Sequence, residues 1–311
     1  MNYGLSIITP HYNYIMGLEK IYSCLKVQTL KNWQWVIVDD FSDEAIVTAT
    51  KKWYQQINDE RVLLVCNSEK TNASVCRNQG ATKARFESLV FLDADDTISK
   101  DFVKNRHLVF NDFVVFKNWA VLGADGSQVN KGTKRQDYLN CFLNAKFIWQ
   151  TSTILWKKSF FNQIGQFDPN LERLQDVELS IRGLLLGNQF QVIDNKIDFY
   201  YTPNPIRSKT DIVERSCRSV NYLISKIEQR YSLNASQIKL LQAYYFACVK
   251  NLQRTKNRSD VVFVKQSLIL FREKRFINFY QSAQGIILLF LYRYQLISDS
   301  LFLKWNRYLF K

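Results

Sequence analysis

The stretch Val90-Phe-Leu-Asp-Ala-Asp-Asp96 decides the fold class, because an apolar run ends there in a cluster of carboxylates. Residues 89–92 are apolar throughout, which is typical of a parallel strand that is buried on both faces. The chain turns after such a strand, so one carboxylate can bind a metal ion while another binds a hydroxyl of the ligand. The alternative is a strand end whose solvated acids cap the helix that follows.

Strand and helix signals alternate on both sides of this stretch. Before it, apolar runs predict strands at residues 5–9, 33–38 and 62–65, and helical spacing of apolar residues predicts helices at 18–28, 45–57 and 74–85. Beyond it, we expect strands at 113–122, 190–193 and 197–201, and helices at 135–144, 157–164 and 174–186. This alternation predicts an α/β fold with a mostly parallel sheet flanked by helices.

Polar and acidic residues follow three of the first four predicted strands, in the segments Thr9-Pro-His-Tyr-Asn13, Asp39-Asp40 and Asp93-Ala-Asp-Asp96. Ligands bind at the carboxyl ends of the strands in open α/β sheets. The chain has only two histidines and no C-x-x-C pair, which argues against a histidine-based zinc site. Carboxylates gathered at this edge therefore predict a hard divalent cation, Mg²⁺ or Mn²⁺.

Three further positions have a functional and a structural interpretation. Asp39 can accept the N–H of a base edge, or it can cap the next helix through an Asx turn. Arg77 can reach a phosphate, or it can belong to an ordinary surface helix. Asp176 can be a general base, or it can stabilise the first turn of its helix through the helix dipole.

Taken together, six segments resemble the family 2 glycosyltransferases with the GT-A fold, and they occur in the order found in that family. The segments are Ile8-Thr-Pro-His-Tyr-Asn13, Val36-Ile-Val-Asp-Asp-Phe-Ser42, Ser74-Val-Cys-Arg-Asn-Gln-Gly80, Val90-Phe-Leu-Asp-Ala-Asp-Asp96, Gly165-Gln-Phe-Asp168 and Gln175-Asp-Val-Glu-Leu-Ser-Ile-Arg182. The resemblance covers residues 3–208, and the last hundred residues lie outside it.

The resemblance implies a role for each matched residue in binding a nucleotide sugar. The residues expected to line the nucleobase pocket are Pro10, Tyr12 and Asp39, with Asp39 on the uracil edge. Arg77 is expected near the nucleotide, Asp93 on the ribose, and Asp95 on the metal ion that the diphosphate also binds.

The resemblance also implies that Asp176 is the catalytic base of an inverting transfer, in which a single displacement moves the sugar from a nucleotide diphosphate to the acceptor. We expect UDP as the nucleotide and a saccharide or lipid-linked saccharide as the acceptor, in the synthesis of a surface polysaccharide or lipooligosaccharide. The candidate residues for acceptor contact are Trp149, Thr151 and Ser152. Gln175 departs from the family pattern, which has Glu there, so a nucleotide-sugar-binding protein without turnover stays an alternative.

The last third of the chain is strongly basic, with 18 Lys and Arg against 6 Asp and Glu in residues 209–311. Apolar spacing predicts helices at 213–231, 235–254, 261–271, 282–296 and 301–310, with aromatic and basic residues interleaved in the last two. This composition is typical of helices at an anionic lipid surface. Packing on the catalytic domain, a homodimer contact and nucleic-acid binding are the alternatives, and nucleic acid would leave the acids at the strand ends unexplained.

These patterns predict two domains. Residues 1–208 form a GT-A catalytic domain, with a nucleotide-binding half at about 1–96 and an acceptor half at 97–208, and residues 209–311 form a basic helical region. Six scattered cysteines predict reduced thiols rather than disulfides. The N-terminal residues lack a signal-peptide pattern, and the longest apolar run, residues 285–292, is too short to span a bilayer. We therefore expect a cytoplasmic protein that is peripheral to the cytoplasmic face of the membrane.

Overall fold

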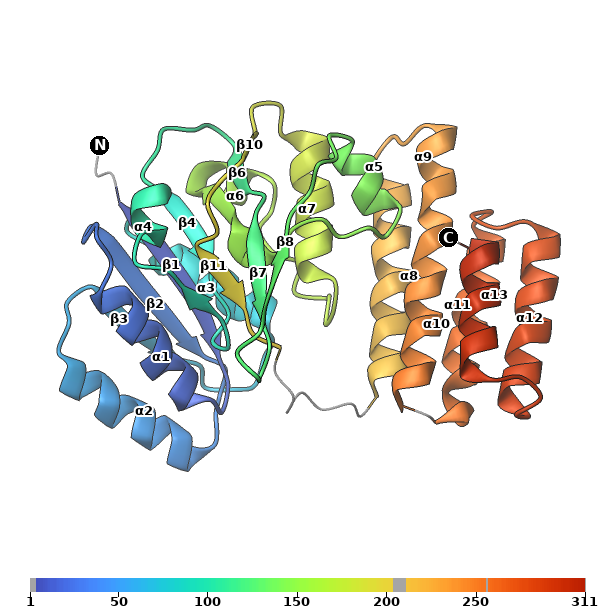
Figure 1. Ribbon diagram of the computed structural model, residues 1–311, viewed down its shortest axis with the longest axis horizontal. Helices are drawn as coiled ribbons and strands as arrows, with labels where there is room; N and C mark the ends of the chain where they lie inside the picture. The colour runs from blue at the N-terminus through green and yellow to red at the C-terminus, as the bar shows by residue number, and fades with distance from the viewer. Residues whose placement is uncertain (1–3, 204–210, 256, 311) are drawn as a thin grey trace. The chain divides into compact units, whose positions relative to one another are not determined.

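The computed structural model describes residues 4–203, 211–255 and 257–310, which form two compact units (Figure 1). The first, here called the sheet unit, contains residues 1–135, 148–169 and 182–205. The second, here called the helical unit, contains residues 136–147, 170–181 and 206–311. The predicted domain boundary at residue 208 falls outside the described residues.

The main sheet of the sheet unit has seven strands in the order β10-β6-β9-β4-β1-β2-β3. The strands are β1 (Leu5–His11), β2 (Trp33–Asp39), β3 (Val62–Cys66), β4 (Ser88–Phe91), β6 (Phe113–Phe116), β9 (Ile154–Lys157) and β10 (Gln191–Ile193). Strand β9 pairs antiparallel with β4 and β6, whereas the other pairings are parallel. The prediction of a mostly parallel α/β sheet is confirmed.

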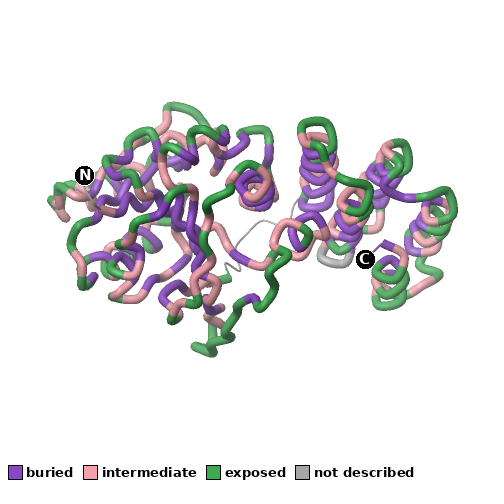
Figure 2. The backbone as a smooth tube through the Cα atoms, turned by 90° about the horizontal axis from the view of Figure 1, so that it is seen from above, coloured by how far each residue is buried: buried purple, intermediate pink, exposed green. Residues whose placement is uncertain are grey.

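The first three strands are each followed by a helix, namely α1 (Ile15–Lys26), α2 (Glu44–Ile57) and α3 (Ala73–Lys83). Helix α3 begins after Asn72, whose side chain accepts hydrogen bonds from two backbone N–H groups of the first turn. Gly80 lets α3 approach the sheet, because a Cβ there would lie 2.4 Å from Cγ2 of Ile8. Strands β1, β2 and β6 are buried almost throughout, and Figure 2 shows exposed loops at the outside of the chain.

A second, four-stranded sheet has the order β5-β11-β7-β8, with β5 (Thr97–Ile98), β7 (Trp119–Leu122), β8 (Gln128–Lys131) and β11 (Phe199–Tyr201). The prediction of a single strand at 113–122 was wrong, because β6 and β7 belong to different sheets. Asn118 separates them: its backbone N–H donates to the side chain of Asn195, and its own amide donates to Asp194 and to the Asn195 carbonyl. These contacts with residues far along the chain turn the backbone out of the main sheet.

The rest of the sheet unit consists of short elements and a buried ion pair. The short helices are α4 (Phe102–Asn105), η1 (Thr151–Thr153) and α6 (Lys158–Gln163). Arg106, which follows α4, is fully buried and pairs with Asp198 at 2.8 Å. The Arg106 guanidinium also stacks over the rings of Phe102 and Phe116. This pair ties the α4 segment to the residues just before β11.

The helical unit contains α5 (Tyr138–Leu143), α8 (Ile212–Arg230), α9 (Ala235–Leu240), η2 (Leu241–Ala243), α10 (Tyr244–Thr255), η3 (Arg258–Asp260), α11 (Val261–Glu273), α12 (Phe279–Arg293) and α13 (Asp299–Phe310). Helix α7 (Gln175–Leu186) contributes residues 175–181 to this unit and the rest to the sheet unit. The predicted helical character of the C-terminal region is confirmed, although the predicted helix at 235–254 is three short elements. Among the described residues, no helix is long and apolar enough to cross a membrane.

Candidate functional site

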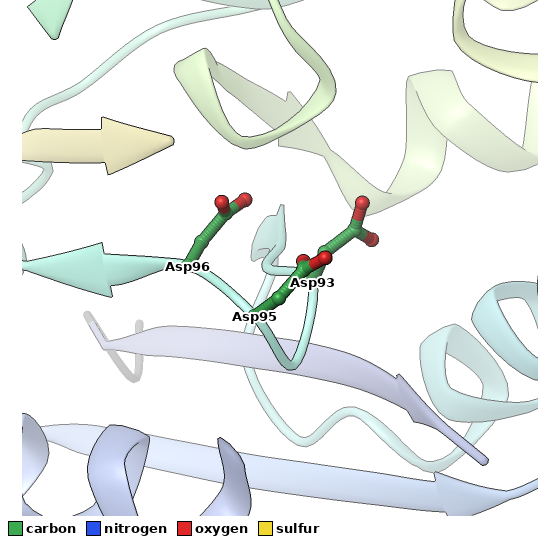
Figure 3. Close-up of side chains that lie close together, drawn as sticks. All are labelled: Asp93, Asp95 and Asp96. Carbon is green, nitrogen blue, oxygen red and sulfur yellow. The ribbon is translucent and has the colours of Figure 1, made fainter. Parts of the chain in front are cut away.

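Three carboxylates crowd together immediately after β4. One oxygen from each of Asp93, Asp95 and Asp96 lies within 4.8 Å of the other two (Figure 3). The turn is closed by the Asp96 N–H, which donates to the Asp93 carbonyl. Asp96 is buried and also accepts a hydrogen bond from the backbone N–H of Thr202. The fold thus concentrates negative charge at the carboxyl end of a central strand.

Helix α3 brings a cation to this cluster. The Nη2 atom of Arg77 lies 2.6 Å from Oδ1 of Asp93, and the Arg77 side chain is almost completely buried. The guanidinium is also held over the ring of Phe167, at 5.2 Å from its centroid. Arg77 and Asp93, two of the predicted site residues, are therefore in direct contact.

The acid cluster has the donor chemistry of a site for a hard divalent cation. Its potential ligands are carboxylate oxygens only, the type that Mg²⁺ and Mn²⁺ prefer, without the sulfur or imidazole ligands typical of zinc. Carboxylates this close together repel one another when both are ionised, and a bound cation reduces that repulsion. Asp95 belongs to the cluster as predicted, and Asp96 joins it.

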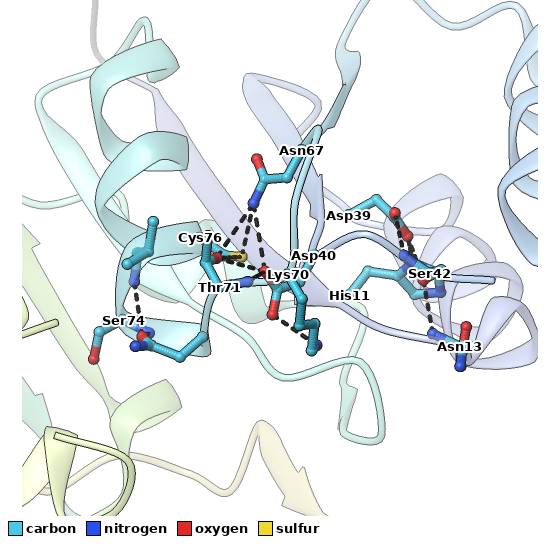
Figure 4. A network of polar contacts seen from close by, with 12 residues as sticks. His11, Asn13, Asp39, Asp40, Ser42, Asn67, Lys70, Thr71, Ser74 and Cys76 are labelled. Carbon is cyan, nitrogen blue, oxygen red and sulfur yellow. Dashed lines mark hydrogen bonds and ion pairs between the residues drawn. The ribbon is translucent and has the colours of Figure 1, made fainter. Parts of the chain in front are cut away.

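A second group of polar contacts surrounds Asp39 at the end of β2 (Figure 4). The Asp39 carboxylate is almost completely buried and accepts hydrogen bonds from both the N–H and the hydroxyl of Ser42. Nε2 of His11 accepts the backbone N–H of Tyr14, so Nδ1 carries the ring proton and donates it to Asp39 at 2.7 Å. Burial by itself would raise the pKa of Asp39, but the hydrogen bonds from His11 and Ser42 hold that pKa below its ordinary value.

The neighbouring Asp40 organises the loop after β3. Its carboxylate accepts hydrogen bonds from both the N–H and the hydroxyl of Thr71, and it pairs with Lys70 at 2.8 Å. Burial opposes the ionisation of Asp40, yet the contacts with Lys70 and Thr71 outweigh it and lower its pKa. Asp40 therefore fixes residues 70–71 beside the end of β2.

Two exposed aromatic rings lie at the same strand ends. The ring of Tyr12 is about half exposed, and the Lys70 ammonium lies 3.3 Å from its centroid. Phe41 is also exposed and has a backbone φ of +60°, a conformation that is costly for a residue with a Cβ. Both rings line a hollow of about 620 Å³ that continues along the first turns of α2 and the end of β3. The hollow offers flat apolar faces beside fixed polar groups.

The predicted residues of the acceptor segment lie around η1. Trp149 and Ser152 are buried, whereas Thr151 is half-buried. Pro10 lies in β1, opposite Val38 of β2. These four positions belong to the sheet unit, as do Tyr12, Asp39, Arg77, Asp93 and Asp95.

Asp176 lies in the first turn of α7, within the helical unit. The preceding Leu174 has a φ of +62°, so the backbone reverses sharply before the helix begins. The next turn of α7 is anchored by Glu178, which pairs with Lys226 of α8 at 2.7 Å, and both side chains are nearly buried. Burial raises the pKa of Tyr244 in α10, and the charge of Asp176 raises it further. Asp176 is thus held near α10 by the packing of α7 on α8.

Sequence reasoning gave several residues of these networks no role of their own. It named Asp40 and Asp96 only as members of the acidic strand ends, where each directly follows a predicted site residue. Lys70 and Thr71 gave no signal, because they lie about 30 positions from Asp40 in an irregular loop.

The main sheet carries an oxygen-ligand cluster, an arginine and a hollow with aromatic walls at its strand ends. This arrangement is typical of α/β enzymes that bind their ligands at the carboxyl ends of the strands. A family model described as "Glycosyl transferase family 2" matches residues 6–158. The chain belongs to glycosyltransferase family 2, and its fold is GT-A.

Two relatives illustrate the similarity in sequence. The amylovoran biosynthesis glycosyltransferase AmsB of Erwinia amylovora is 29% identical over 64% of this chain and 69% of AmsB. The Escherichia coli protein WfgD, named UDP-Glc:alpha-D-GlcNAc-diphosphoundecaprenol beta-1,3-glucosyltransferase, is 26% identical over 39% of this chain. The matched region spans half the length of WfgD.

Solved structures share the fold at low sequence identity. Staphylococcus aureus TarS 1-349 in complex with UDP-GlcNAc superimposes with a TM-score of 0.61 at 16% identity, covering 93% of this chain and 87% of that one. The mannosyltransferase PcManGT from Pyrobaculum calidifontis, in complex with GDP-Man and Mn²⁺, gives a TM-score of 0.57 at 15% identity, covering 98% and 84%. These likenesses show the fold of the chain.

Proposed function

We propose that this glycosyltransferase is inverting and depends on a divalent cation, and that it moves a sugar from a UDP-linked donor to a saccharide or lipid-linked saccharide acceptor. The observation that carries the proposal is the cluster of Asp93, Asp95 and Asp96, with Arg77 bound to its edge. Crowded carboxylates next to an arginine suit a cation shared with a diphosphate. Mn²⁺ and UDP-GlcNAc in the two structural neighbours support the choice of cation and donor class.

In this proposal, Pro10, Tyr12 and Asp39 line the nucleobase pocket. The hydrogen bonds from His11 and Ser42 keep the Asp39 carboxylate ionised and oriented, so it is a preorganised acceptor for an N–H of the base. Asp93 takes the ribose and Asp95 the cation, and Arg77 holds Asp93 in place. When bound, the cation would neutralise the charge that develops on the leaving diphosphate.

We assign Asp176 as the general base. Its carboxylate would accept the proton of the acceptor hydroxyl while that oxygen attacks the anomeric carbon on the face opposite the leaving diphosphate. The bond to the diphosphate oxygen breaks as the new glycosidic bond forms, so the configuration at the anomeric carbon inverts. Positioned base catalysis of this kind contributes roughly 10²–10⁴-fold to the rate.

The acceptor assignment rests on one sequence segment and on what two relatives are named for. Trp149, Thr151 and Ser152 remain our candidates for acceptor contact. The name of WfgD specifies an acceptor linked to diphosphoundecaprenol, and AmsB is named for the synthesis of a polysaccharide, which supports a role in surface polysaccharide or lipooligosaccharide synthesis. A lipid-linked acceptor would place the enzyme at the cytoplasmic face of a membrane.

The proposal is tested with purified protein, a panel of nucleotide sugars and Mn²⁺. We expect one UDP-sugar to raise the melting temperature, more strongly with Mn²⁺ than without. We expect Asp176→Asn to keep this stabilisation and to lose donor turnover by roughly 10²–10⁴-fold. The matched control is Glu172→Gln, an exposed acid just before the same helix.

Two outcomes would overturn parts of the proposal. Turnover by Asp176→Asn close to that of the wild type removes the assignment of the base. Donor binding by the wild type without any turnover, with acceptors supplied, favours a nucleotide-sugar-binding protein, the alternative raised by Gln175. The Gln175 amide donates to the Leu171 carbonyl, so this side chain is tied to the turn before α7.

A further inference from the structure

Helix α12 presents an apolar face to solvent. Its buried side consists of Ser282, Gly285, Leu289 and Tyr292. Gly285 packs closely on its neighbours, since a Cβ there would lie 2.9 Å from Leu268 of α11 and 3.3 Å from Phe310 of α13. Six large apolar residues, five of α12 and Tyr294 directly after it, are between 43% and 76% exposed: Phe279, Tyr280, Ile286, Ile287, Phe290 and Tyr294.

These six residues form one stripe along the helix, because their spacing follows the helical repeat and they alternate with the buried set. Residues 279–292 contain no Asp, Glu, Lys or Arg. A helix on the surface of a water-soluble unit ordinarily carries charges on its outer face, so this stripe marks an interaction surface. The neighbouring α13 adds exposed Leu301, Trp305 and Tyr308. We call the six residues of this stripe and these three of α13 the apolar face.

Cationic side chains border the apolar face. The guanidinium of Arg272 lies 6.0 Å from the centroid of the Phe279 ring. Arg293 ends α12, and Lys304 and Arg307 are exposed on α13. A hollow of about 480 Å³ at the first turn of α12 is lined by Arg272, Arg275 and Lys239.

We propose that the apolar face docks on the surface of an anionic phospholipid bilayer, with α12 lying parallel to that surface. Aromatic rings favour the depth of the lipid headgroups, and arginine and lysine pair with lipid phosphates. The helix has 15 residues and is bordered by cations, which suits a position in the interface rather than across it. This inference goes beyond sugar transfer and does not depend on it.

Charge complementarity favours a bilayer over a second copy of the chain. In a symmetric dimer the same patch meets itself, so the basic border that contains Arg293, Lys304 and Arg307 would face the basic border of the second copy around the buried apolar centre. The excess of basic residues throughout 209–311 adds to this repulsion. At an anionic lipid surface, the same cations would lie next to negatively charged phosphates, which attract them.

The test is co-sedimentation of the purified full chain with two kinds of vesicle, phosphatidylcholine alone and phosphatidylcholine with phosphatidylglycerol. We expect binding to the anionic vesicles to be at least tenfold tighter than to the neutral ones and to weaken with salt. The double variant Ile287→Ser/Phe290→Ser is expected to reduce binding at least tenfold. Val109→Ser, which changes an even more exposed apolar residue of the sheet unit, is expected to bind like the wild type.

Thermal unfolding of each variant shows that it is folded before its binding is compared, and Arg293→Gln/Lys304→Gln provides a second variant that should lose selectivity for anionic vesicles. Equal binding by Ile287→Ser/Phe290→Ser and the wild type would overturn the proposal. A second result would also overturn it: the wild-type chain binds neither kind of vesicle and elutes as a dimer, and Ile287→Ser/Phe290→Ser elutes as a monomer. A second copy of the chain would then cover the apolar face. Neither result bears on turnover of a soluble donor, so the proposed function is judged separately.

Discussion

Two groups of carboxylates lie at the same edge of the main sheet, but the side chains that surround them differ. Asp39 and Asp40 follow β2, and donors from the chain itself surround them: His11 and Ser42 on one, Lys70 and Thr71 on the other. Both have lowered pKa values despite burial. Their charge is thus stabilised by the protein, and their hydrogen bonds hold the loops that follow β1, β2 and β3.

The group after β4 gathers three carboxylates within 4.8 Å of one another, with Arg77 paired to Asp93. Negative charge is concentrated there, beside the Arg77 guanidinium. The comparison teaches that burial of acids at strand ends has two uses. Acids with several donors from the chain position loops, whereas acids crowded against each other are suited to hold an external cation.

The largest expected effect comes from Asp95→Asn, which tests the second half of this comparison. Replacing this carboxylate by an amide removes a charged ligand of the proposed cation, so we expect a loss of transfer of roughly 10²–10³-fold and a smaller rise in melting temperature on addition of Mn²⁺. Enzyme kinetics and thermal unfolding measure the two effects. Asp125→Asn, in the exposed turn between β7 and β8, is the control. Unchanged stabilisation by Mn²⁺ in Asp95→Asn would remove Asp95 from the cation site.

The variant Asp39→Asn tests the first half of the comparison, which concerns the acids after β2. Its expected effect is on the free energy of unfolding. An amide cannot accept all the hydrogen bonds that His11 and Ser42 donate to the carboxylate, so we expect the free energy of unfolding to fall by about 1–3 kcal/mol at pH 7. Because the pKa of Asp39 is lowered in the folded state, its ionised form contributes stability above the ordinary pKa of about 4. That contribution is lost as the pH falls through the lowered value.

The difference in stability between the wild type and Asp39→Asn should therefore shrink below about pH 4. Urea unfolding across a pH series measures it, and Glu19→Gln, an exposed acid on α1, is the control. A difference that stays constant down to the acid limit would show that Asp39 acts through packing rather than through its charge.

Lys70→Met gives the smallest expected effect. The Lys70 side chain is nearly half exposed, so its ion pair with Asp40 is screened by solvent and contributes at most about 1 kcal/mol to stability. Thr71 continues to donate to Asp40 in this variant. Chemical unfolding measures the change in the free energy of unfolding, and Lys20→Met, which changes an exposed lysine of α1, is the control. A loss as large as that of Asp39→Asn would mean that Lys70, rather than Thr71, maintains the network of Asp40.

Local patterns in the sequence were sufficient to predict much of this protein. Apolar runs and helical spacing placed the first four strands and the helices between them within a few residues, and the acids after the strands pointed to the sheet edge. Strands and helices can be predicted in this way because the spacing of their apolar residues repeats over neighbouring positions. The helical character of the last third was readable for the same reason, although the exposed stripe on α12 was not.

The tertiary structure decided what depends on residues distant in sequence. The split between β6 and β7 depends on Asn118 meeting Asn195, and the role of Asp40 depends on Lys70 and Thr71 reaching it from another loop. Whether an apolar residue of α12 is buried depends on which side α11 and α13 cover. The sequence by itself determined the elements, their order and the acidic strand ends, because these arise from local periodicity. Only packing decided which acids are stabilised by donors of the chain, which are crowded together and which apolar face stays exposed. The energy of each arrangement depends on neighbours that are distant in the sequence.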